Sequence, residues 1–381
     1  MHDSLSQFAS DFCAAISGGS EVFHSAVTGR GDSEFGRWAL RLWRLQLEEN
    51  PALASDLRGR GVDPERVQDW REIPPMPAAA FKELELSSIP PLRRTRVFHS
   101  SGTTGQVPSR HFHCPESLQV YEASLRPWFR RHLLPESLGG PGDPGPRVLS
   151  LTPAPKAAPH SSLAYMLDVV VRNTAPGGNV EGPFFGSLDS EGAWTVEANR
   201  LVEALEGASE AGVCVLLAGT AFNFVHLIDR LDATGCRLVL PKGSRIMETG
   251  GYKGRSRVLA RPELHAALTD RLGIPPEWIV GEYGMSELSS QAYDTIAGTG
   301  GVRCLRFPPW ARAVVISPEH GREVGEGETG LVRILDLANV WSVLCLQTAD
   351  LALRRGDGIE LVGRLAGAEP RGCSLHSVGG S

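Results

Sequence analysis

The sequence predicts an α/β protein with a mostly parallel, helix-covered sheet followed by a small β-rich part. Short apolar segments alternate with helix-length amphipathic segments between residues 147 and 280, which is the pattern of a parallel sheet covered on both faces. After about residue 300 the helical pattern stops, and short apolar segments separated by glycine remain. The 43 glycines and 27 prolines cluster between apolar runs, which predicts many tight turns.

The first hundred residues are predicted to be helical. Apolar residues recur at helical spacing over residues 4–16 and 33–49, with Ser33 as a candidate cap of the second helix. The second helix carries its apolar residues on about one face: Phe35, Trp38, Ala39, Leu42, Trp43 and Leu45. Such a stripe usually belongs to the core, and a membrane-binding or partner-binding face is the alternative.

The same periodicities predict the elements of the rest of the chain. Strands are expected at 97–98, 147–151, 213–218, 237–240 and 278–280. Helices are expected between them at 161–171, 196–210, 222–234 and 262–272. A closing antiparallel or barrel-like subdomain is expected from strands at 313–317, 331–335, 342–346 and 359–362.

Composition and charge exclude several classes of protein. The chain has 38 Lys and Arg against 44 Asp and Glu, a net charge of −6, so it offers no general basic surface for nucleic acid. Its seven cysteines form no Cys-x-x-Cys pair, which favours free thiols in a reducing compartment. No apolar run approaches the ~20 residues of a membrane span, and no secretory signal opens the chain. A cytoplasmic protein without a membrane span is expected.

A loop rich in glycine and hydroxyl groups follows the 97–98 strand. It reads Ser100-Ser101-Gly102-Thr103-Thr104-Gly105-Gln106. Such a loop can turn backbone N–H and side-chain O–H groups toward phosphate oxygens. It lacks the Gly-Lys-Ser/Thr of a Walker A loop, so a P-loop NTPase is disfavoured. A flexible turn is the alternative.

Three further elements follow in order along the chain. Gly281-Glu282-Tyr283-Gly284-Met285-Ser286-Glu287 comes directly after the 278–280 strand, and ligands bind at the carboxyl ends of strands in open α/β sheets. Tyr283 offers a ring for stacking on a base, and Glu287 a carboxylate that can hold Mg²⁺ together with phosphate oxygens. In Thr348-Ala349-Asp350 and Gly363-Arg364, the carboxylate can accept hydrogen bonds from ribose and the guanidinium can bind ribose or phosphate.

These four elements together resemble the adenylate-forming superfamily, which includes acyl-CoA synthetases, firefly luciferase and peptide-synthetase adenylation domains. The resemblance covers about residues 95 to 365 and implies ATP and Mg²⁺ as cofactors. It implies that Ser100 to Gly105 cradle the phosphates, that Tyr283, Gly284 and Ser286 line the nucleotide site, that Glu287 binds Mg²⁺ and that Asp350 binds the ribose. The implied fold is the large N-terminal domain of that superfamily. The C-terminal lid domain, with its catalytic lysine, is expected to be absent because 17 residues follow Arg364.

Two positions depart from the superfamily pattern. Ser286 stands where threonine is usual and keeps the hydroxyl. Val107-Pro108-Ser109-Arg110 stands where the pattern usually has Pro-Lys, so Arg110 lies near the place of that lysine.

A narrower resemblance involves the two ends of the chain. Ile73-Pro74-Pro75-Met76-Pro77 precedes Phe81-Lys82, Phe98-His99 precedes the hydroxyl-rich loop, and Arg371-Gly372-Cys373-Ser374-Leu375 lies near the C-terminus. This set is similar to the acyl-protein synthetases of bacterial luminescence operons (LuxE type). The resemblance implies that a free fatty acid is activated as acyl-AMP and that a cysteine near the C-terminus receives the acyl group before an acyl reductase does.

The chemistry is consistent with a thiol acceptor at Cys373. Joining a carboxylate to AMP creates a good leaving group, and a thiolate can then attack the carbonyl. Arg371 and His376 are near enough in sequence to lower the pKa of the Cys373 thiol. A surface cysteine without a role is the alternative. The other cysteines in apolar runs are expected to be buried small hydrophobes: Cys13, Cys214, Cys236, Cys304 and Cys345.

A metal site at Arg110-His111-Phe112-His113-Cys114 is disfavoured. Strand alternation places His111 and His113 on one face and Cys114 on the other, and no second cluster of ligands is evident.

The sequence thus predicts ATP-dependent activation of a carboxylic acid, by resemblance a fatty acid, to acyl-AMP with release of pyrophosphate. Transfer to Cys373 and onward to an acyl reductase or carrier protein would follow, with Cys373, Glu287 and Arg364 as catalytic residues. An acid:CoA or acid:carrier-protein ligase is the alternative. A non-catalytic nucleotide-binding partner of a biosynthetic complex is an alternative of another class. Three regions are expected: helical (1–95), an α/β nucleotide-binding core (96–300), and a β-rich subdomain with the tail that carries Cys373 (301–381).

Overall fold

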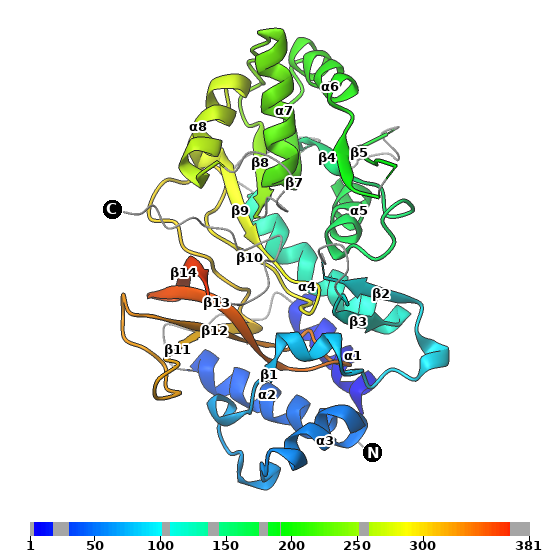
Figure 1. Cartoon of the computed structure of the whole chain (residues 1–381), viewed down its shortest axis with the longest axis vertical. Coiled ribbons are helices and arrows are strands. Elements are labelled where there is room, and N and C mark those ends of the chain that lie inside the picture. The colour runs from blue at the N-terminus through cyan, green and yellow to red at the C-terminus, as the bar shows by residue number, and fades with distance from the viewer. Residues whose placement is uncertain are drawn as a thin grey trace. The chain divides into compact units, whose positions relative to one another are not determined.

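The computed structural model describes residues 4–17, 30–100, 107–135, 145–174, 182–190, 192–250 and 259–365 (Figure 1). The chain divides into two compact units that alternate along the sequence. Among the described residues, the first contains those up to Pro127, Met285–Ala292 and Arg306–Leu365; the second contains Trp128–Gly284 and Tyr293–Leu305. The sequence predicted three consecutive regions, with boundaries near residues 95 and 300. This division into three regions is still a prediction.

The first unit begins with three helices, α1 (Leu5–Ser17), α2 (Arg30–Glu49) and α3 (Pro51–Gly59). The two helices predicted from periodicity are present, and the apolar stripe of α2 is mostly buried. Ser33 is not its cap, because α2 begins three residues earlier and places Asp32 in its first turn, where a negative charge is favourable. In α3, Asn50 accepts a hydrogen bond from the Leu53 backbone N–H at 3.1 Å.

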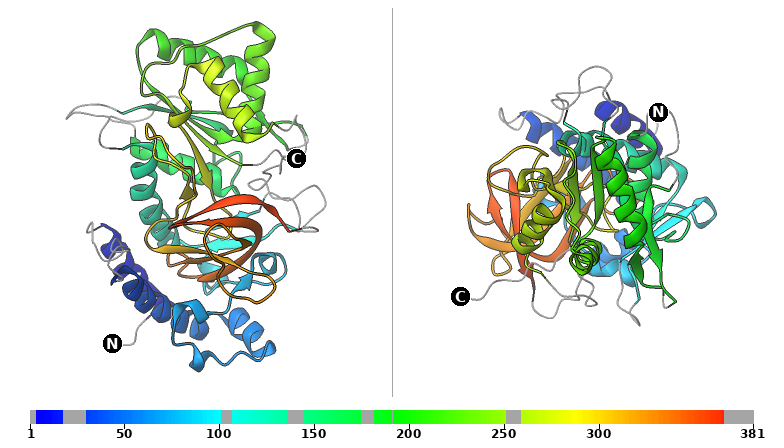
Figure 2. Two further views of the ribbon diagram at one scale, coloured as in Figure 1. Left: turned by 90° about the vertical axis from the view of Figure 1, so that its left-hand side faces the viewer. Right: turned by 90° about the horizontal axis from the view of Figure 1, so that it is seen from above.

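The β-rich part of the first unit is a mainly antiparallel sheet, as predicted. Its strands are β1 (Met76–Pro77), β11 (Ala311–Ile316), β12 (Thr329–Asp336), β13 (Cys345–Arg355) and β14 (Gly358–Arg364). The order is β1-β13-β12-β11, with β14 paired to β13 and only β1 parallel to its neighbour. Figure 2 shows the later strands of this sheet, in orange and red, curling along their length.

A two-stranded hairpin and a long helix complete the first unit. β2 (Arg96–His99), which was predicted, pairs in antiparallel fashion with β3 (Arg110–His113). Helix α4 (Pro115–Leu133) follows, and the boundary between the units lies inside it, at Pro127. Short 3₁₀ turns occupy Pro64–Arg66, Trp70–Glu72, Ala78–Lys82 and Pro91–Arg93 in this unit, and Pro276–Trp278 in the second.

The second unit is built on the predicted parallel sheet. Its strands are β4 (Arg147–Pro153), β5 (Phe184–Leu188), β6 (Trp194–Val196), β7 (Val215–Thr220), β8 (Arg245–Thr249), β9 (Ile279–Tyr283) and β10 (Ala292–Tyr293). The order is β10-β9-β8-β7-β4-β5-β6, and the pairs from β9 to β5 are parallel. The four predicted helices are present as α5 (Ser162–Thr174), α6 (Ala198–Glu210), α7 (Ala221–Thr234) and α8 (Arg261–Leu272).

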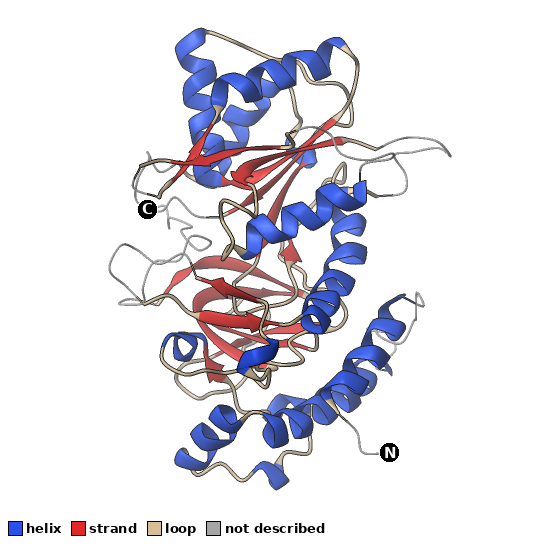
Figure 3. Cartoon of the chain, turned by 90° about the vertical axis from the view of Figure 1, so that its right-hand side faces the viewer, coloured by secondary structure: helices blue, strands red, loops and turns tan. Residues whose placement is uncertain are grey.

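Both faces of this sheet are buried. Leu149, Leu217 and Ile246 belong to a core that is shared with α6, α7 and α8. Figure 3 shows helices, in blue, packed along the strands of this sheet, in red. Alternate residues such as Val148 and Leu216 are equally buried but do not belong to that cluster. The sequences of its strands are therefore mostly continuous apolar runs, as expected for strands covered on both sides.

One predicted strand was wrong, and the strand that replaces it was missed. Residues 237–240 are irregular: Leu238 and Leu240 are buried and bond through their backbones to the end of α8, whereas Val239 is 75% exposed. The strand at this position in the sheet is β8, which is buried throughout although it contains Arg245 and Glu248. These two charged residues concealed it from a hydrophobicity pattern, since their charges are balanced only by tertiary partners.

Among the described residues, no helix is both long enough and apolar enough to cross a membrane. Cys304 and Cys345 are buried, as predicted. Cys13, Cys214 and Cys236 are partly exposed, so the prediction that they are buried was wrong. Cys13 lies in α1, whereas Cys214 and Cys236 lie in irregular segments next to β7 and α7.

Candidate active site

The hydroxyl-rich loop joins β2 to β3. At its base, the Ser109 backbone N–H donates a hydrogen bond to Ser100 Oγ at 2.9 Å. Residues 101–106 lie outside the described residues, so the phosphate-binding role of Ser101, Gly102, Thr103, Thr104 and Gly105 is still a prediction. The two ends of the loop are held by the antiparallel pairing of His99 with Arg110.

The base of this loop contacts the carboxylate that was predicted to bind Mg²⁺. Ser109 Oγ donates a hydrogen bond to Glu287 Oε1 at 2.8 Å, and Ser286 Oγ donates to Glu287 Oε2 at 3.0 Å. All three side chains are buried. Both carboxylate oxygens thus face hydroxyl groups, which are neutral donors. Ser109 was not singled out as a site residue from the sequence, although it lies three residues after Gln106, the last residue of the predicted loop.

Two buried side chains fix the backbone around Glu287. Asn339 Nδ2 donates to the Glu287 carbonyl at 2.9 Å. Asp336 accepts hydrogen bonds from the Ser289 and Ser290 backbone N–H groups at 3.0 and 2.8 Å. Burial raises the pKa of Asp336, while these hydrogen bonds act in the opposite direction. The sequence signal for both residues was weak: an Asp and an Asn shortly after an apolar run.

A pair of buried histidines lies behind the Ser286–Glu287 segment. His111 Nδ1 donates to the Ser286 carbonyl at 2.8 Å. Burial lowers the pKa of His111 to about 4, against the opposing effects of this hydrogen bond and of the Glu287 charge. The rings of His111 and His113 are 4.3 Å apart between centroids, so they share a face as strand alternation predicted. In the described part of the chain, no group of three or more His, Cys, Asp and Glu residues could hold a metal ion.

Asp350 and Arg364 form a second pair in the first unit. They are directly opposite each other in the β13–β14 ladder, and Arg364 Nη1 lies 3.3 Å from Asp350 Oδ1. Their side chains are 2% and 12% exposed. Two motifs that the sequence placed 14 residues apart therefore act as one buried ion pair. Their roles toward ribose and phosphate are still predictions.

Tyr283 and Gly284 belong to the second unit. Tyr283 is the last residue of β9 and is buried, and Gly284 follows it immediately before the chain enters the first unit. Beside Tyr283, Glu282 is paired in the sheet with Thr249. Burial and the nearby Glu248 charge raise the pKa of Glu282 to about 7, although a hydrogen bond with Thr249 opposes this.

The remaining predicted residues are less informative. Arg110 begins β3 and is half-buried, with its guanidinium carbon 5.9 Å from the centroid of the Phe112 ring. Cys373 lies outside the described residues, so its role as acyl acceptor is untested.

Comparison with known proteins identifies the fold. No family model and no curated protein matches the chain. Among solved structures, 2-hydroxyisobutyryl-CoA ligase in the postadenylation state with 2-HIB-AMP has a TM-score of 0.60 at 14% identity, over 87% of this chain and 65% of the ligase. The same ligase with 2-HIB-AMP and CoA in the thioesterification state gives 0.59 at 14% identity, over 86% and 64%. ATP-bound MatB from Rhodopseudomonas palustris gives 0.48 at 16% identity, over 71% and 48%.

The chain therefore spans about 65% of the length of the CoA ligase that it matches. The match extends over both units, since it covers 87% of the present chain. At this level of identity the likeness establishes architecture. The chain has the fold of the N-terminal domain of adenylate-forming enzymes.

Proposed function

We propose that this protein is an adenylate-forming ligase that activates a carboxylic acid with ATP, giving acyl-AMP and pyrophosphate. The observation that carries the proposal is the contact of Ser109 with Glu287, which joins the base of the hydroxyl-rich loop to the carboxylate of the second motif. On the fold of adenylate-forming enzymes, this contact unites a phosphate-binding loop with a residue suited to a divalent cation.

The residues around Glu287 fit Mg²⁺. The ion prefers oxygen ligands and is commonly held by one or two carboxylates together with substrate phosphates. Glu287 supplies such oxygens, and the hydroxyls of Ser109 and Ser286 orient them. When bound there, Mg²⁺ would supply positive charge against the phosphate oxygens.

The protein's own groups would act mainly by orientation and by hydrogen bonding. The substrate carboxylate attacks the α-phosphate, the bond to the bridging oxygen breaks, and pyrophosphate leaves with the electron pair. Negative charge is dispersed over the phosphate oxygens in this transition state, and the N–H and O–H groups of the loop would stabilise it. Asp350, oriented by Arg364, would accept hydrogen bonds from the ribose hydroxyls.

We further propose that the acyl group passes to Cys373, as the resemblance to LuxE-type synthetases implies. The thiolate attacks the acyl carbonyl, a thioester forms, and AMP leaves. A fatty acid as substrate, an acyl reductase or carrier protein as the next acceptor, and a cytoplasmic location belong to the same proposal. An acid:CoA ligase is the second candidate, because the compared ligase has been crystallised with both its adenylate and CoA.

A single assay separates these functions. The protein is incubated with ATP, Mg²⁺ and a panel of acids; pyrophosphate is followed, and intact mass is recorded before and after hydroxylamine. We expect pyrophosphate release and a hydroxylamine-labile adduct that is lost in Cys373→Ser and kept in Cys236→Ser, which removes a partly exposed thiol instead. Release that requires added CoA, without an adduct, would favour the CoA ligase. ATP binding without release for every acid would reject catalysis.

A further inference from the structure

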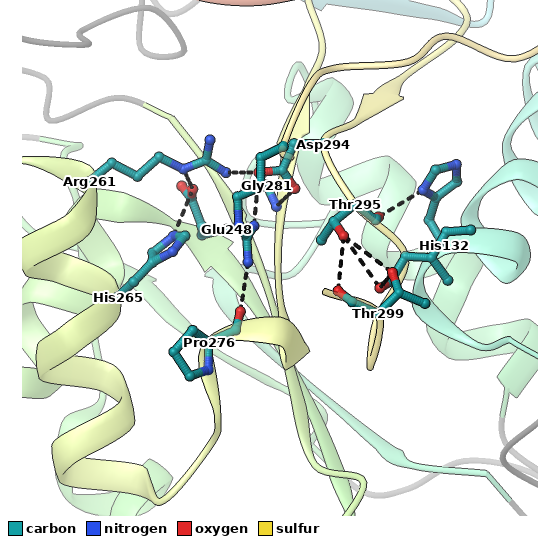
Figure 4. Close-up of polar contacts among 11 residues, drawn as sticks. His132, Glu248, Arg261, His265, Pro276, Gly281, Asp294, Thr295 and Thr299 are labelled. Atoms are coloured by element: carbon teal, nitrogen blue, oxygen red, sulfur yellow. Dashed lines mark hydrogen bonds and ion pairs between the residues drawn. The ribbon is translucent and has the colours of Figure 1, made fainter. Parts of the chain in front are cut away.

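A network of two buried carboxylates and two partly exposed guanidinium groups connects three segments of the second unit (Figure 4). Arg261, the first residue of α8, donates from Nε to Glu248 Oε1 at 2.7 Å and from Nη2 to Asp294 Oδ2 at 2.5 Å. Arg303 Nη1 donates to the same Asp294 oxygen at 2.9 Å. The carboxylates of Glu248 and Asp294 are 5% and 2% exposed. One guanidinium thus bridges β8 and the segment that follows β10.

Asp294 also forms hydrogen bonds with the backbone of β9 and so links Arg261 to that strand. The Gly281 N–H donates to Asp294 Oδ1 at 2.7 Å, and the Asp294 N–H donates to the Gly281 carbonyl at 3.0 Å. A Cβ atom on residue 281 would overlap Arg261 Nη2 and would lie 3.0 Å from Asp294 Oδ2. A side chain at residue 281 would therefore displace the Arg261 guanidinium from its place beside Asp294.

The charges of this network balance one another. Burial favours the neutral form of Glu248, but Arg261 and His265 outweigh it and lower the pKa of Glu248 to about 2. Glu248 and Asp294 in turn raise the pKa of Arg261 against its burial. Removing Arg261 would leave two buried carboxylates undercompensated, with Arg303 still beside one of them, and such a loss is far more costly than the loss of an exposed pair.

The network lies directly before the residues that would flank the nucleotide. Gly281 pairs with Glu248 in the sheet, and Glu282 pairs with Thr249. Tyr283 follows at the carboxyl end of β9, the edge of a parallel sheet at which ligands bind. Asp294, which Arg261 and Arg303 hold in place, is the member of the network that accepts a hydrogen bond from the backbone of β9.

We propose that Arg261 is a positioning residue for nucleotide binding: through Asp294 it fixes the backbone at Gly281 and thereby the Glu282–Tyr283 segment at the end of β9. The part of this inference that concerns the nucleotide rests on the proposed function, whereas the fixing of β9 does not. The effect is expected on affinity for ATP and not on affinity for the acid.

The matched control is Arg271 at the other end of α8. It is 29% exposed, against 26% for Arg261, and Arg271 Nη2 likewise forms an ion pair with a carboxylate, that of Asp232, at 2.7 Å. Arg261→Gln should raise the Kd for ATP, measured by calorimetry, by roughly tenfold or more, because binding would then have to order the Glu282–Tyr283 segment. Arg271→Gln should leave the Kd within about twofold, because the partner carboxylate of Arg271, on Asp232, is 42% exposed. Arg261→Lys should recover part of the affinity, because it keeps the charge but not the planar fork.

Amide hydrogen exchange tests the fixing of β9 without any ligand. Arg261→Gln and Asp294→Asn should accelerate exchange at residues 279–283 and leave β7 unchanged, and Arg271→Gln should change neither. Unchanged exchange at β9 in both variants would overturn the inference. Faster exchange with an unaltered Kd for ATP would show that the network stabilises β9 but does not affect nucleotide binding, and would overturn the positioning role of Arg261. If the wild-type protein binds no ATP, or releases no pyrophosphate with any acid, the proposed function fails while the exchange data still decide whether Arg261 fixes β9.

Discussion

Asp350 and Arg364 face each other across β13 and β14, with 3.3 Å between Oδ1 and Nη1 in a nearly solvent-free position. Removing one member of such a pair leaves an uncompensated buried charge. We expect Arg364→Gln to lower the free energy of unfolding by about 3 kcal/mol, and the double variant with Asp350→Asn to lose less than the sum of the single losses. Urea unfolding of the four proteins provides the cycle. Strictly additive losses would mean that the two side chains are not coupled.

The contact of Ser109 with Glu287 predicts graded effects on catalysis. Glu287→Gln should reduce pyrophosphate release by about 100-fold or more and raise the Mg²⁺ concentration needed for half-maximal rate, because it removes the carboxylate proposed as ligand. Ser109→Ala should reduce the rate by about tenfold, since it removes one hydrogen bond to a charged group. Ser150→Ala serves as the control, because it removes a buried hydroxyl of the second unit whose hydrogen bonds are with Thr152. Equal effects of the two serine substitutions would argue against an orienting role.

Glu282 predicts a pH dependence of stability. Its pKa in the folded protein is about 7, above the ordinary value of 4.5, so the folded state binds its proton more tightly than the unfolded state does. The corresponding stability is fully present below pH 4.5 and is lost as the pH rises through 7, by about 3 kcal/mol in total. Glu282→Gln should remove this part of the slope between pH 5 and 8. Parallel profiles for the two proteins would contradict the raised pKa.

The lowered pKa of His111 predicts a pH dependence of stability with the opposite sign. Its pKa in the folded protein is about 4, below the ordinary value of 6.5, so the folded state favours the neutral ring. This stability is present above pH 6.5 and is lost as the pH falls through 4. In NMR spectra, the His111 ring signals should therefore show no titration between pH 8 and 5. A midpoint near 6.5 would place the ring in contact with solvent.

The sequence predicted most of the fold because apolar periodicity is local. The alternation of helices and strands in the second unit and the antiparallel strands after residue 300 both depended only on short-range patterns. Strand β8 escaped because Arg245 and Glu248 interrupt its apolar run, and their partners, among them Arg261, come from distant segments. The start of α2 was placed too late because Ser33 has the chemistry of a cap without its position.

For the candidate site, too, the sequence revealed local motifs but not the contacts between residues that are distant in sequence. The order of the motifs singled out Glu287, Asp350 and Arg364, whose roles stay predictions; all three have buried polar partners in the first unit. Ser109, His111 and Asn339 were missed because their part in the site is a contact with residue 286 or 287, more than 50 positions away in each case. The environment of Gly281 could not be predicted either, because nothing in the sequence indicates that the Arg261 guanidinium lies beside it.

The passage of the chain from one unit to the other between Gly284 and Met285 has a practical consequence for dissecting the protein. A recombinant fragment spanning residues 128–305 would retain Tyr283 with its neighbours in the second unit, but it would also remove Met285–Ala292 from the first. Glu287 would then be separated from Ser109, and Ser289 and Ser290 from Asp336. Neither unit of the protein is a continuous piece of the chain, so complementation experiments require junctions grafted at residues 284 and 293.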